Sequence, residues 1–498
     1  MHARHGERGV TIILVVAFMA IFTLLLGSVT SYTFTQSHYG RALYAREQAL
    51  QIAEAGIEYY RWFLAHEPYD LTNGTGQAGP YAYTVNDPEG GTLGTASITI
   101  SGNQTCGVTE SVDITSVGTA DANPVFKRTL FARYMRPSVA EYSHIVNDNV
   151  WAGADRNITG PYHSNGGIRM DGTNNSDVTS AVSNWVCDSS FGCSPTNNAA
   201  NGVFGAGPNS ALWQYPVPQV DFASFFGSLG TTTAALYSLS YLDGLFLGPT
   251  STRLNGVQQS GPYSSVGGSD QRGYHLIFRS DGSIDVYRVT GTTYVRGYNA
   301  LLGWHNDYSI ISSQTFVGTY TPPSDCALIF AQAKVWIEGT VSGRVTLVAA
   351  DTGSFVPNVL FANNSLTYQT IDGTTGLTVI SEGSIIIPLL SPNVMTVRGI
   401  FIAQTGLFGR NHYTTSGSNA VPGAYSSYVQ RSTLTTNGSV VSFRRVGTKW
   451  LCGSPGVYCS GYNTRIDNYD RLLAFLPPPF TPAASADARF VLWREEEN

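Results

Sequence analysis

The longest apolar stretch of the chain lies close to its N-terminus. No Asp, Glu, Lys or Arg occurs between Gly9 and Gly40, and the run from Val10 to Val29 is almost wholly apolar. A helix of about 20 such residues rises about 30 Å, which is enough to cross the hydrocarbon core of a bilayer. A secretory signal would have a shorter apolar core that ends in a small-residue cleavage site, and this run has no such end. The pattern therefore predicts one transmembrane helix.

The helical pattern continues beyond the apolar run and stops at Pro68. Residues 41–65 contain no Pro and a single Gly. Small and apolar residues recur there at three- and four-residue steps, which predicts one narrow apolar face. That face consists of Ala45, Ala49, Ile52, Ala53, Gly56, Tyr60 and Phe63. We therefore expect a leader peptide over 1–9 and one transmembrane and amphipathic stalk helix over 10–67.

The charges beside the span predict which side of the membrane holds the bulk of the protein. The residues before it carry Arg4 and Arg8 against Glu7, although Arg41 and Arg46 beyond the span reduce the contrast. Positively charged flanks tend to stay in the cytoplasm. We expect a single-pass protein of the cytoplasmic (inner) membrane, in contact with membrane lipid, with its C-terminal bulk on the extracytoplasmic side.

Beyond residue 68 the pattern changes to the two-residue period of β-strands. Residues 68–137 alternate apolar and polar side chains, for example in SITI (97–100), and predict a small β domain packed on the stalk. Residues 273–291 predict a hairpin, since two alternating strands flank the turn sequence SDGS. The fold class expected for the chain is α+β, with a long N-terminal helix followed by a mainly β ectodomain.

A second sequence pattern recurs between residues 138 and 476. A short apolar strand, a Gly-containing corner and a second strand occur at 144–172, 334–350, 376–388 and 398–410. This recurrence favours the stacked rungs of a β-solenoid, in which each rung buries its face only against its neighbours. The spacing is irregular, so a β-sandwich stays open as the alternative. Residues 477–498 form the last segment, with a Pro run and a final strand.

The composition agrees with an exported β protein. Charged residues make up 12% of the 498 residues, about half the usual fraction. Gly, Ser, Thr, Asn and aromatic residues take their place. The net charge is −6, so the chain lacks the basic field that holds nucleic acid. We therefore expect no nucleic-acid partner.

Four of the six cysteines form two local pairs in the sequence. Cys187 lies close to Cys193, and Cys452 lies close to Cys459, but neither pair has the spacing of a zinc ribbon. An even number of cysteines in an exported domain favours disulfides. We expect both local pairs to be bonded, with free thiols as the alternative. The two remaining cysteines form a third bond or stay free.

The N-terminal region resembles a known family. The stretch ERGVTIILVVAFMAIFTLLLG and the later AREQALQIAEAGIEYYRW are similar to PilX-like minor pilins of type IV pili, and also to the K-type tip pseudopilin of type II secretion. In this family a prepilin peptidase cuts after the glycine that ends the leader. The resemblance implies a cut between Gly9 and Val10, with prepilin peptidase and other pilin subunits as partners. It covers residues 1–65, and a plain membrane anchor is the alternative.

One position departs from the pattern of the major pilins. They carry Glu at the fifth residue after the cut, where this chain has Leu14. Minor pilins of the PilX and K types often lack this acid too. Together with the large region beyond the stalk, the missing acid implies a tip or assembly-priming subunit, located at an extracellular pilus tip.

No motif of a known reaction occurs in the chain, whether a nucleophile elbow, an H-E-x-x-H helix, a Walker loop or a dinucleotide fingerprint. His163, beside two glycines, is expected to be a turn or stacking residue. Glu338 and Glu382 precede Gly corners in two rungs, where a carboxylate pair could cleave polysaccharide. Solvated corner carboxylates are the preferred interpretation. We expect no enzyme activity, no cofactor and no metal site.

Aromatic residues are the stronger functional lead. The chain has 28 Tyr and 8 Trp, and such side chains on loops bind sugars and proteins through flat, amphipathic faces. Three hypotheses follow in order of preference. The first is a structural, minor pilin-like subunit, the second is a membrane-anchored adhesin that binds surface glycans or proteins, and the third is a solenoid enzyme that acts on polysaccharide.

Overall fold

The chain forms two compact units in a computed structural model that describes residues 7–68, 70–222, 244–247, 252–254, 257–259, 272–324, 326–350, 356–453, 456–485 and 487–496. The first unit comprises Met1–Asn103, Thr109–Met135 and Phe490–Asn498, and the second comprises Gln104–Val108 and Arg136–Arg489. Residues 1–6 of the expected leader lie outside the described residues. The second unit therefore occupies two gaps in the sequence of the first, a short one at 104–108 and a long one at 136–489.

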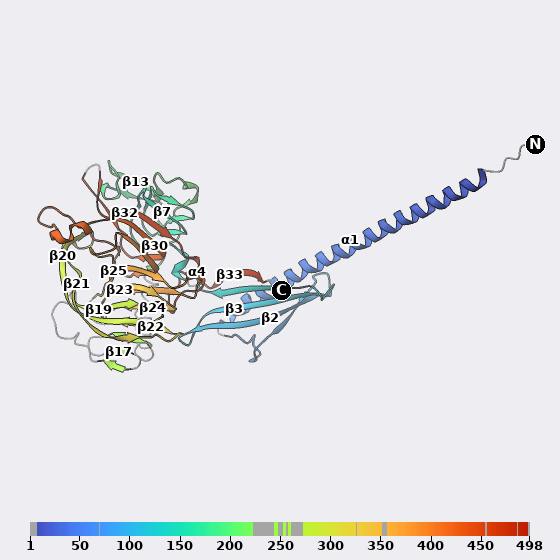
Figure 1. Ribbon diagram of the computed structural model, residues 1–498, viewed down its shortest axis with the longest axis horizontal. Coiled ribbons are helices and arrows are strands. Elements are labelled where there is room, and N and C mark those ends of the chain that lie inside the picture. The colour runs from blue at the N-terminus through green and yellow to red at the C-terminus, as the bar shows by residue number, and fades with distance from the viewer. Residues whose placement is uncertain are drawn as a thin grey trace, which may run out of the picture. The chain divides into compact units, whose positions relative to one another are not determined.

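The first unit begins with one continuous helix, α1 (Glu7–His66), of 60 residues (Figure 1). Its length is about 90 Å at the usual rise per residue. Among the described residues it is the one helix long and apolar enough to cross a membrane, with a mean hydropathy of 2.8 in its most apolar window. The long apolar N-terminal helix expected from sequence is confirmed, and it is the candidate membrane anchor.

A five-stranded sheet completes the described part of the first unit, in the order β1-β2-β3-β4-β33. These strands are β1 (Tyr81–Asn86), β2 (Thr92–Thr105), β3 (Val108–Ala120), β4 (Lys127–Met135) and β33 (Arg489–Glu496). β1 pairs with β2, and β3 with β4, in antiparallel register. β33 comes from the C-terminal segment of the chain, so the sheet joins this segment to four strands that lie before residue 136.

The C-terminal half of α1 packs closely on this sheet. Ala49, Ala53 and Tyr60 are fully buried in one core with Ile98 and Ile114 of the strands. The apolar face expected from the three- and four-residue spacing therefore faces the sheet. Phe63 is partly buried at the edge of this core.

Small residues set the distance between helix and sheet. A Cβ added at Gly56 would lie 2.7 Å from Ala96 Cβ, and one added at Gly118 would lie 2.0 Å from Ala49 O of the helix backbone. Real Cβ atoms essentially never approach so closely. The two glycines thus allow the backbones of α1 and β3 to come together.

The second unit is built mainly on parallel ladders. Successive strands stack on one another (Figure 1), and Leu347 pairs with Val379, which pairs with Phe401 in turn. The strands of this first ladder are, in spatial order, β16 (Leu245–Leu247), β22 (Ala327–Ala331), β24 (Arg344–Ala349), β26 (Gly376–Ser381), β28 (Val394–Ala403), β30 (Gln430–Ser442), β5 (His144–Val146), β8 (Tyr162–Ser164), β11 (Val178–Ser180) and β15 (Trp213–Gln214).

Further parallel strands run beside this ladder. One set is β19 (Gly273–Phe278), β23 (Lys334–Val341), β25 (Val359–Tyr368), β27 (Ile385–Ile386) and β29 (Phe408–Gly409). A second set continues from β30 through β32 (Val457–Asn468), β7 (Arg156–Ile158) and β10 (Thr173–Asn174), and a third is β6 (Val150–Ala152), β9 (Ile168–Met170) and β14 (Val203–Phe204). The main core lies between the first ladder and the β19–β29 set, since Leu347 and Phe361 are buried in one cluster.

Antiparallel arms extend from these ladders. The largest is the pair β20 (Ile284–Asn299) and β21 (Gly303–Tyr320), which joins β19 through β20 and so confirms the hairpin expected at 273–291. The others are β17 (Thr252–Leu254) with β18 (Val257–Gln259), β31 (Lys449–Cys452) with β32, and β12 (Asn184–Cys187) with β13 (Asn197–Asn201). Beyond α1 the chain is therefore mainly β-structure, as expected.

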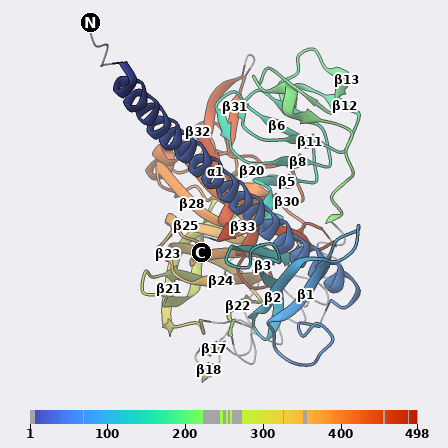
Figure 2. The ribbon, with the colours of Figure 1, turned by 90° about the vertical axis from the view of Figure 1, so that its right-hand side faces the viewer.

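Strands β5 and β30 lie side by side in the first ladder (Figure 2). The first strand after the first unit, β5, pairs with β30, which lies near the other end of the sequence. The short helices beside these strands also meet: Val139 N of η1 (Val139–Glu141) donates to Pro482 O at 2.9 Å, and Ser138 Oγ contacts the carbonyl of Leu473 in α4 (Arg471–Phe475) at 3.4 Å. In the part of the chain that the structure describes, the remaining short helices are η2 (Ser189–Phe191), η3 (Ser210–Leu212) and η5 (Gly423–Tyr428).

Candidate functional site

The N-terminal half of α1 presents an apolar surface to its surroundings. Side chains from Val10 onward are exposed along the span, and Leu14, the position at which major pilins carry an acid, is 54% exposed. Helical backbone has all its hydrogen bonds inside the segment, so this surface suits hydrocarbon or the apolar faces of other helices. The cut expected between Gly9 and Val10 stays a prediction.

Disulfides join all six cysteines of the second unit. Cys187 is bonded to Cys193 and Cys452 to Cys459, the two local pairs expected from sequence. The third bond joins Cys106, in the turn between β2 and β3, to Cys326 before β22. Sequence reasoning left this third pair open, because a separation of 220 residues carries no local signal.

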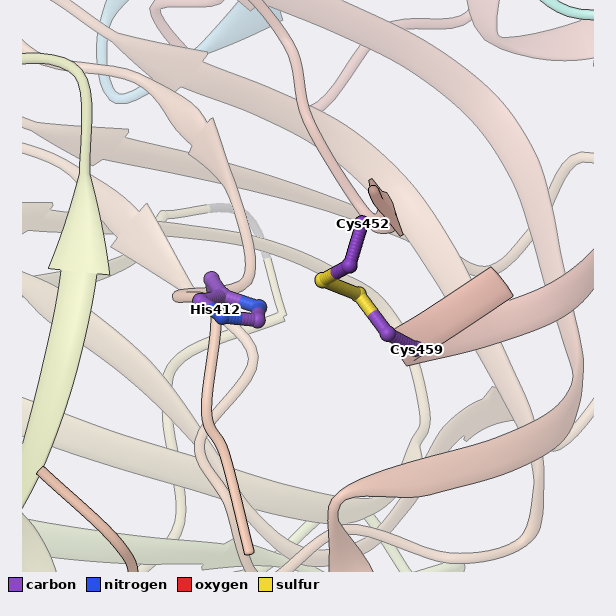
Figure 3. A group of neighbouring side chains, drawn as sticks. All are labelled: His412, Cys452 and Cys459. Carbon is purple, nitrogen blue, oxygen red and sulfur yellow. A yellow bond between two sulfur atoms is a disulfide. The ribbon is translucent and has the colours of Figure 1, made fainter. Parts of the chain in front are cut away.

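The disulfide between Cys452 and Cys459 has a histidine beside it. Figure 3 shows the imidazole of His412 next to the sulfur–sulfur bond. Among the described residues, these three form the one group of three or more His, Cys, Asp or Glu side chains whose ligand atoms all lie within 4.8 Å of one another. Thiolates, not disulfide sulfurs, are the usual cysteine ligands of metals. The group therefore offers one imidazole as a ligand while the bond is intact, and burial lowers the pKa of that imidazole.

An aromatic cluster surrounds His412. Its ring centroid lies 5.6 Å from those of Trp304 and Trp450, and Tyr298 lies 5.7 Å from Trp304. Trp304 is 36% exposed at the tip of the β20–β21 arm, beside the exposed side chain of Leu302. Aromatic rings at a surface can bind sugars and proteins. The aromatic side chains that the sequence suggested as binding residues therefore include a cluster at the tip of the β20–β21 arm.

A second candidate site is a groove of about 600 Å³ beside Glu338. Glu338 lies on β23, where Ile337 pairs with Phe361 of β25 and Gly339 pairs with Leu366. The residues between Phe361 and Leu366 therefore form a bulge opposite Glu338. Bulges interrupt a ladder and redirect side chains, and they are frequent beside functional sites. The lining residues are Ile277, Glu338, Gly339, Thr340, Asn364, Ser365, Thr367 and Pro392.

Hydrogen bonds fix the carboxylate of Glu338 in this groove. His275 Nε2 lies 3.1 Å from Oε1, and Asn364 Nδ2 donates to Oε2 at 2.7 Å. The other ring nitrogen of His275 lies 2.9 Å from Gln314 Oε1. Burial raises the pKa of Glu338, but the hydrogen bonds from His275 and Asn364 outweigh it and hold the pKa below its ordinary value. The carboxylate is therefore ionised at neutral pH.

The structure does not bring Glu338 and Glu382 together in one ladder. Glu338 lies within β23, in the β19–β29 set, whereas Glu382 follows β26 of the first ladder. Glu338 is only 7% exposed, so it is not the solvated corner carboxylate expected from sequence. Its partner His275 comes from a strand far away in sequence, and no local pattern could have indicated the pair.

The histidine singled out in the sequence, His163, is part of a buried hydrogen-bond network. Its Nδ1 lies 2.9 Å from Thr179 Oγ1, and its Nε2 lies 2.9 Å from Asn165 Oδ1. Tyr142 packs edge-on against its ring, and burial lowers its pKa. These contacts suit a structural residue that packs between neighbouring strands.

A buried charged cluster lies near the point where the chain enters the second unit. Arg156 donates to Asp467 at 2.6 Å and to His144 Nε2 at 3.0 Å. Burial and the charge on Arg156 oppose protonation of His144, while Asp467 favours it, and the pKa of His144 is lowered to about 3. Because the neutral imidazole accepts the hydrogen bond from Arg156, protonation of His144 would break this contact.

Comparisons with known proteins give distant structural likenesses. No protein-family model matches the chain, and no curated protein matches it. A solved structure with detectable similarity is that of the competence-associated pilin ComZ from Thermus thermophilus. The two chains are 13% identical with a TM-score of 0.29, over 91% of this chain and 97% of the other.

Proposed function

We propose that this protein is a non-enzymatic, minor pilin-like subunit of a type IV pilus or a related secretion or competence filament. The observation that carries the proposal is the division of α1 into two surfaces. Its N-terminal half is apolar and exposed, whereas its C-terminal half packs on the sheet of the first unit through Ala49, Ala53 and Gly56. The first surface suits lipid before assembly and the helices of other pilin subunits afterwards.

Processing and orientation follow from the same proposal. Prepilin peptidase would cut between Gly9 and Val10 on the cytoplasmic side of the inner membrane, and the β-rich bulk would lie outside. The exposed run from Val10 to Val29 supports this, since it is long enough to span the bilayer. The three disulfides also suit an oxidising, extracytoplasmic compartment.

We propose further that the subunit occupies the tip of the filament or primes its assembly. In pilins the acid five residues after the cut is thought to pair with the terminal amine of a neighbouring subunit. With Leu14 in its place, this subunit offers its own amine at Val10 but no acid to a subunit above it. The second unit, Arg136–Arg489, is also a large body to accommodate at every position of a shaft.

Immunogold labelling of sheared filaments tests the end position. We expect gold particles at filament ends, whereas dense labelling along shafts would refute the proposal and no filament labelling would favour a plain anchor. Leu14→Glu supplies the missing acid and should move part of the label into the shaft. Val15→Glu is the matched control, because it buries an equal charge one residue away without matching the pilin position.

We also infer that the parallel ladders of the second unit are the rungs of a β-solenoid. The in-register stacking of Leu347, Val379, Phe401 and Val440 in one core supports this, because each rung then covers the apolar face of the next.

A second candidate function, an adhesin for surface glycans or proteins, is favoured by the aromatic cluster at the tip of the β20–β21 arm. It is compatible with a place on the filament or with a plain membrane anchor. Trp304→Ala should then reduce attachment of cells to a glycan-coated or protein-coated surface while leaving filament number unchanged. Tyr294→Ala, a change at an exposed ring of the same arm, is the control. Equal attachment by both variants and the unsubstituted protein would exclude this role for the cluster.

A further inference from the structure

The groove beside Glu338 has hydrogen-bonding groups that the fold leaves available. Thr340 Oγ1 lies 3.3 Å from Thr367 Oγ1, and both side chains are half-exposed on the groove. Ser365 Oγ accepts from Thr396 N at 3.0 Å, which leaves its own hydroxyl hydrogen to donate. Hydroxyl and amide groups thus surround one fixed carboxylate.

The carboxylate itself requires a donor from its ligand. An ionised carboxylate only accepts hydrogen bonds, and its two oxygens provide about four acceptor sites. His275 and the side chain of Asn364 each contact one oxygen. The backbone N–H of Asn364 also donates to this carboxylate. Glu338 is one of the residues that line the groove, and O–H groups that donate to a charged oxygen form hydrogen bonds roughly twice as strong as neutral ones.

The charges of the lining exclude anionic ligands. Among its eight residues, Glu338 is the one acid, and neither Lys nor Arg is present to balance a phosphate, a sulfate or a uronate. Ile277 and Pro392 add small apolar surfaces that suit C–H groups. A volume of about 600 Å³ lies within the range of small-ligand sites.

We propose that this groove binds a neutral oligosaccharide, with Glu338 accepting hydrogen bonds from sugar hydroxyl groups. An uncharged sugar chain combines vicinal O–H donors with C–H faces, and both are matched by the lining. His275 and Asn364 act as positioning residues, because they hold the carboxylate in place. The inference gives a ligand class to the adhesin candidate and does not depend on filament assembly.

The test measures binding to the full-length protein in lipid nanodiscs. The probes are cellohexaose, maltohexaose and mannohexaose as neutral chains, an alginate hexamer as an anionic chain, and a glucosamine hexamer as an amine-bearing chain. We expect at least one neutral hexamer to bind more tightly than the two charged hexamers. Glu338→Gln should weaken that binding about tenfold, since it removes a charged acceptor.

Two further variants separate loss of the site from loss of the fold. Thr340→Ala changes a half-exposed groove residue and should weaken binding severalfold with an unchanged melting temperature. Asn364→Ala removes a donor to Glu338 and should also weaken binding, whereas Asn363→Ala, at its exposed neighbour outside the lining, should not.

Several results would overturn the proposal. These are no binding of any neutral hexamer, preference for the alginate or glucosamine hexamer, equal binding by Glu338→Gln and the unsubstituted protein, or release of shorter sugars during incubation. Filament labelling of Glu338→Gln should match that of the unsubstituted protein. Failure of sugar binding therefore leaves the pilin-like role standing, and the two proposals fail separately.

Discussion

The contact between α1 and the first sheet predicts an unusual response to a substitution that normally stabilises helices. Gly56→Ala replaces a helix-interior glycine with the best helix former. At this position, however, the new methyl group would lie 2.5 Å from Ser116 Oγ and 2.7 Å from Ala96 Cβ. The hydroxyl can rotate away, but the alanine Cβ is fixed to its backbone, so helix and sheet must move apart.

The size of the effect follows from two opposing terms. The helix gains about 1 kcal/mol when Ala replaces Gly, while overpacking of a core costs about 1–3 kcal/mol. The net loss is therefore up to about 2 kcal/mol, which corresponds to an equilibrium constant for opening of the sheet about thirtyfold larger. Gly40→Ala in the same helix has the same gain and meets nothing within 4 Å, so it should not destabilise the unit.

Hydrogen exchange of the full-length protein in nanodiscs measures this difference. Peptides from β3 should exchange faster in Gly56→Ala than in Gly40→Ala. Gly118→Ala tests the same contact from the sheet side, where the added Cβ would lie 2.0 Å from Ala49 O, and it should also accelerate exchange. If β3 exchanges as slowly in both contact variants as in Gly40→Ala, then close approach of the two backbones does not limit the stability of this unit.

Three other predictions concern acid, disulfides and processing. Lowering the pH from 7 to 5 should reduce the free energy of unfolding by about 2 kcal/mol through His144, because the pKa of this imidazole is lower in the folded state than in the unfolded chain. Chemical denaturation at the two pH values should show a smaller reduction for His144→Gln than for the unsubstituted protein. Cys326→Ser should reduce the melting temperature more than Cys459→Ser. The disulfide of Cys326 joins residues 220 positions apart, whereas that of Cys459 joins residues 7 positions apart. Mass spectrometry of the mature protein should find Val10 at the N-terminus. Gly9→Trp should prevent the cut, because a bulky side chain blocks close approach of the peptidase to the backbone. An N-terminus at any other residue would contradict the family resemblance.

The features that could be predicted from sequence are those with a local signal. The apolar run after Gly9 and the small-residue spacing up to Tyr60 lie on one helix, so composition and periodicity sufficed to predict α1 and its buried face. The hairpin at 273–291 and the local disulfides likewise involve residues close together in the chain. In each case one short segment contains all the interacting residues.

The features that sequence could not reveal are pairings between distant segments. The sequence predicts a solvated carboxylate at Glu338, before a Gly corner. Its burial and its contact with His275 depend on the register of β19 against β23. Cys106 and Cys326 meet only after the second unit has folded. The strand of the C-terminal segment was expected, but its position next to β4 depends on the whole intervening chain.

The two ends of the segment from Arg136 to Arg489 lie beside each other, with consequences for how such proteins can change. Ser138 and Ala483 form a bridge, and Arg489 contacts Glu141 at 2.7 Å, so the two ends of the inserted unit are neighbours. Insertion at neighbouring chain ends disturbs a host domain little. The first unit can therefore serve as a constant carrier into which different cargo modules are exchanged between residues 136 and 489, once Cys106, which is bonded to Cys326 of the exchanged segment, is replaced as well. A short linker in place of the cargo would yield a minimal carrier, formed by α1 and its sheet alone.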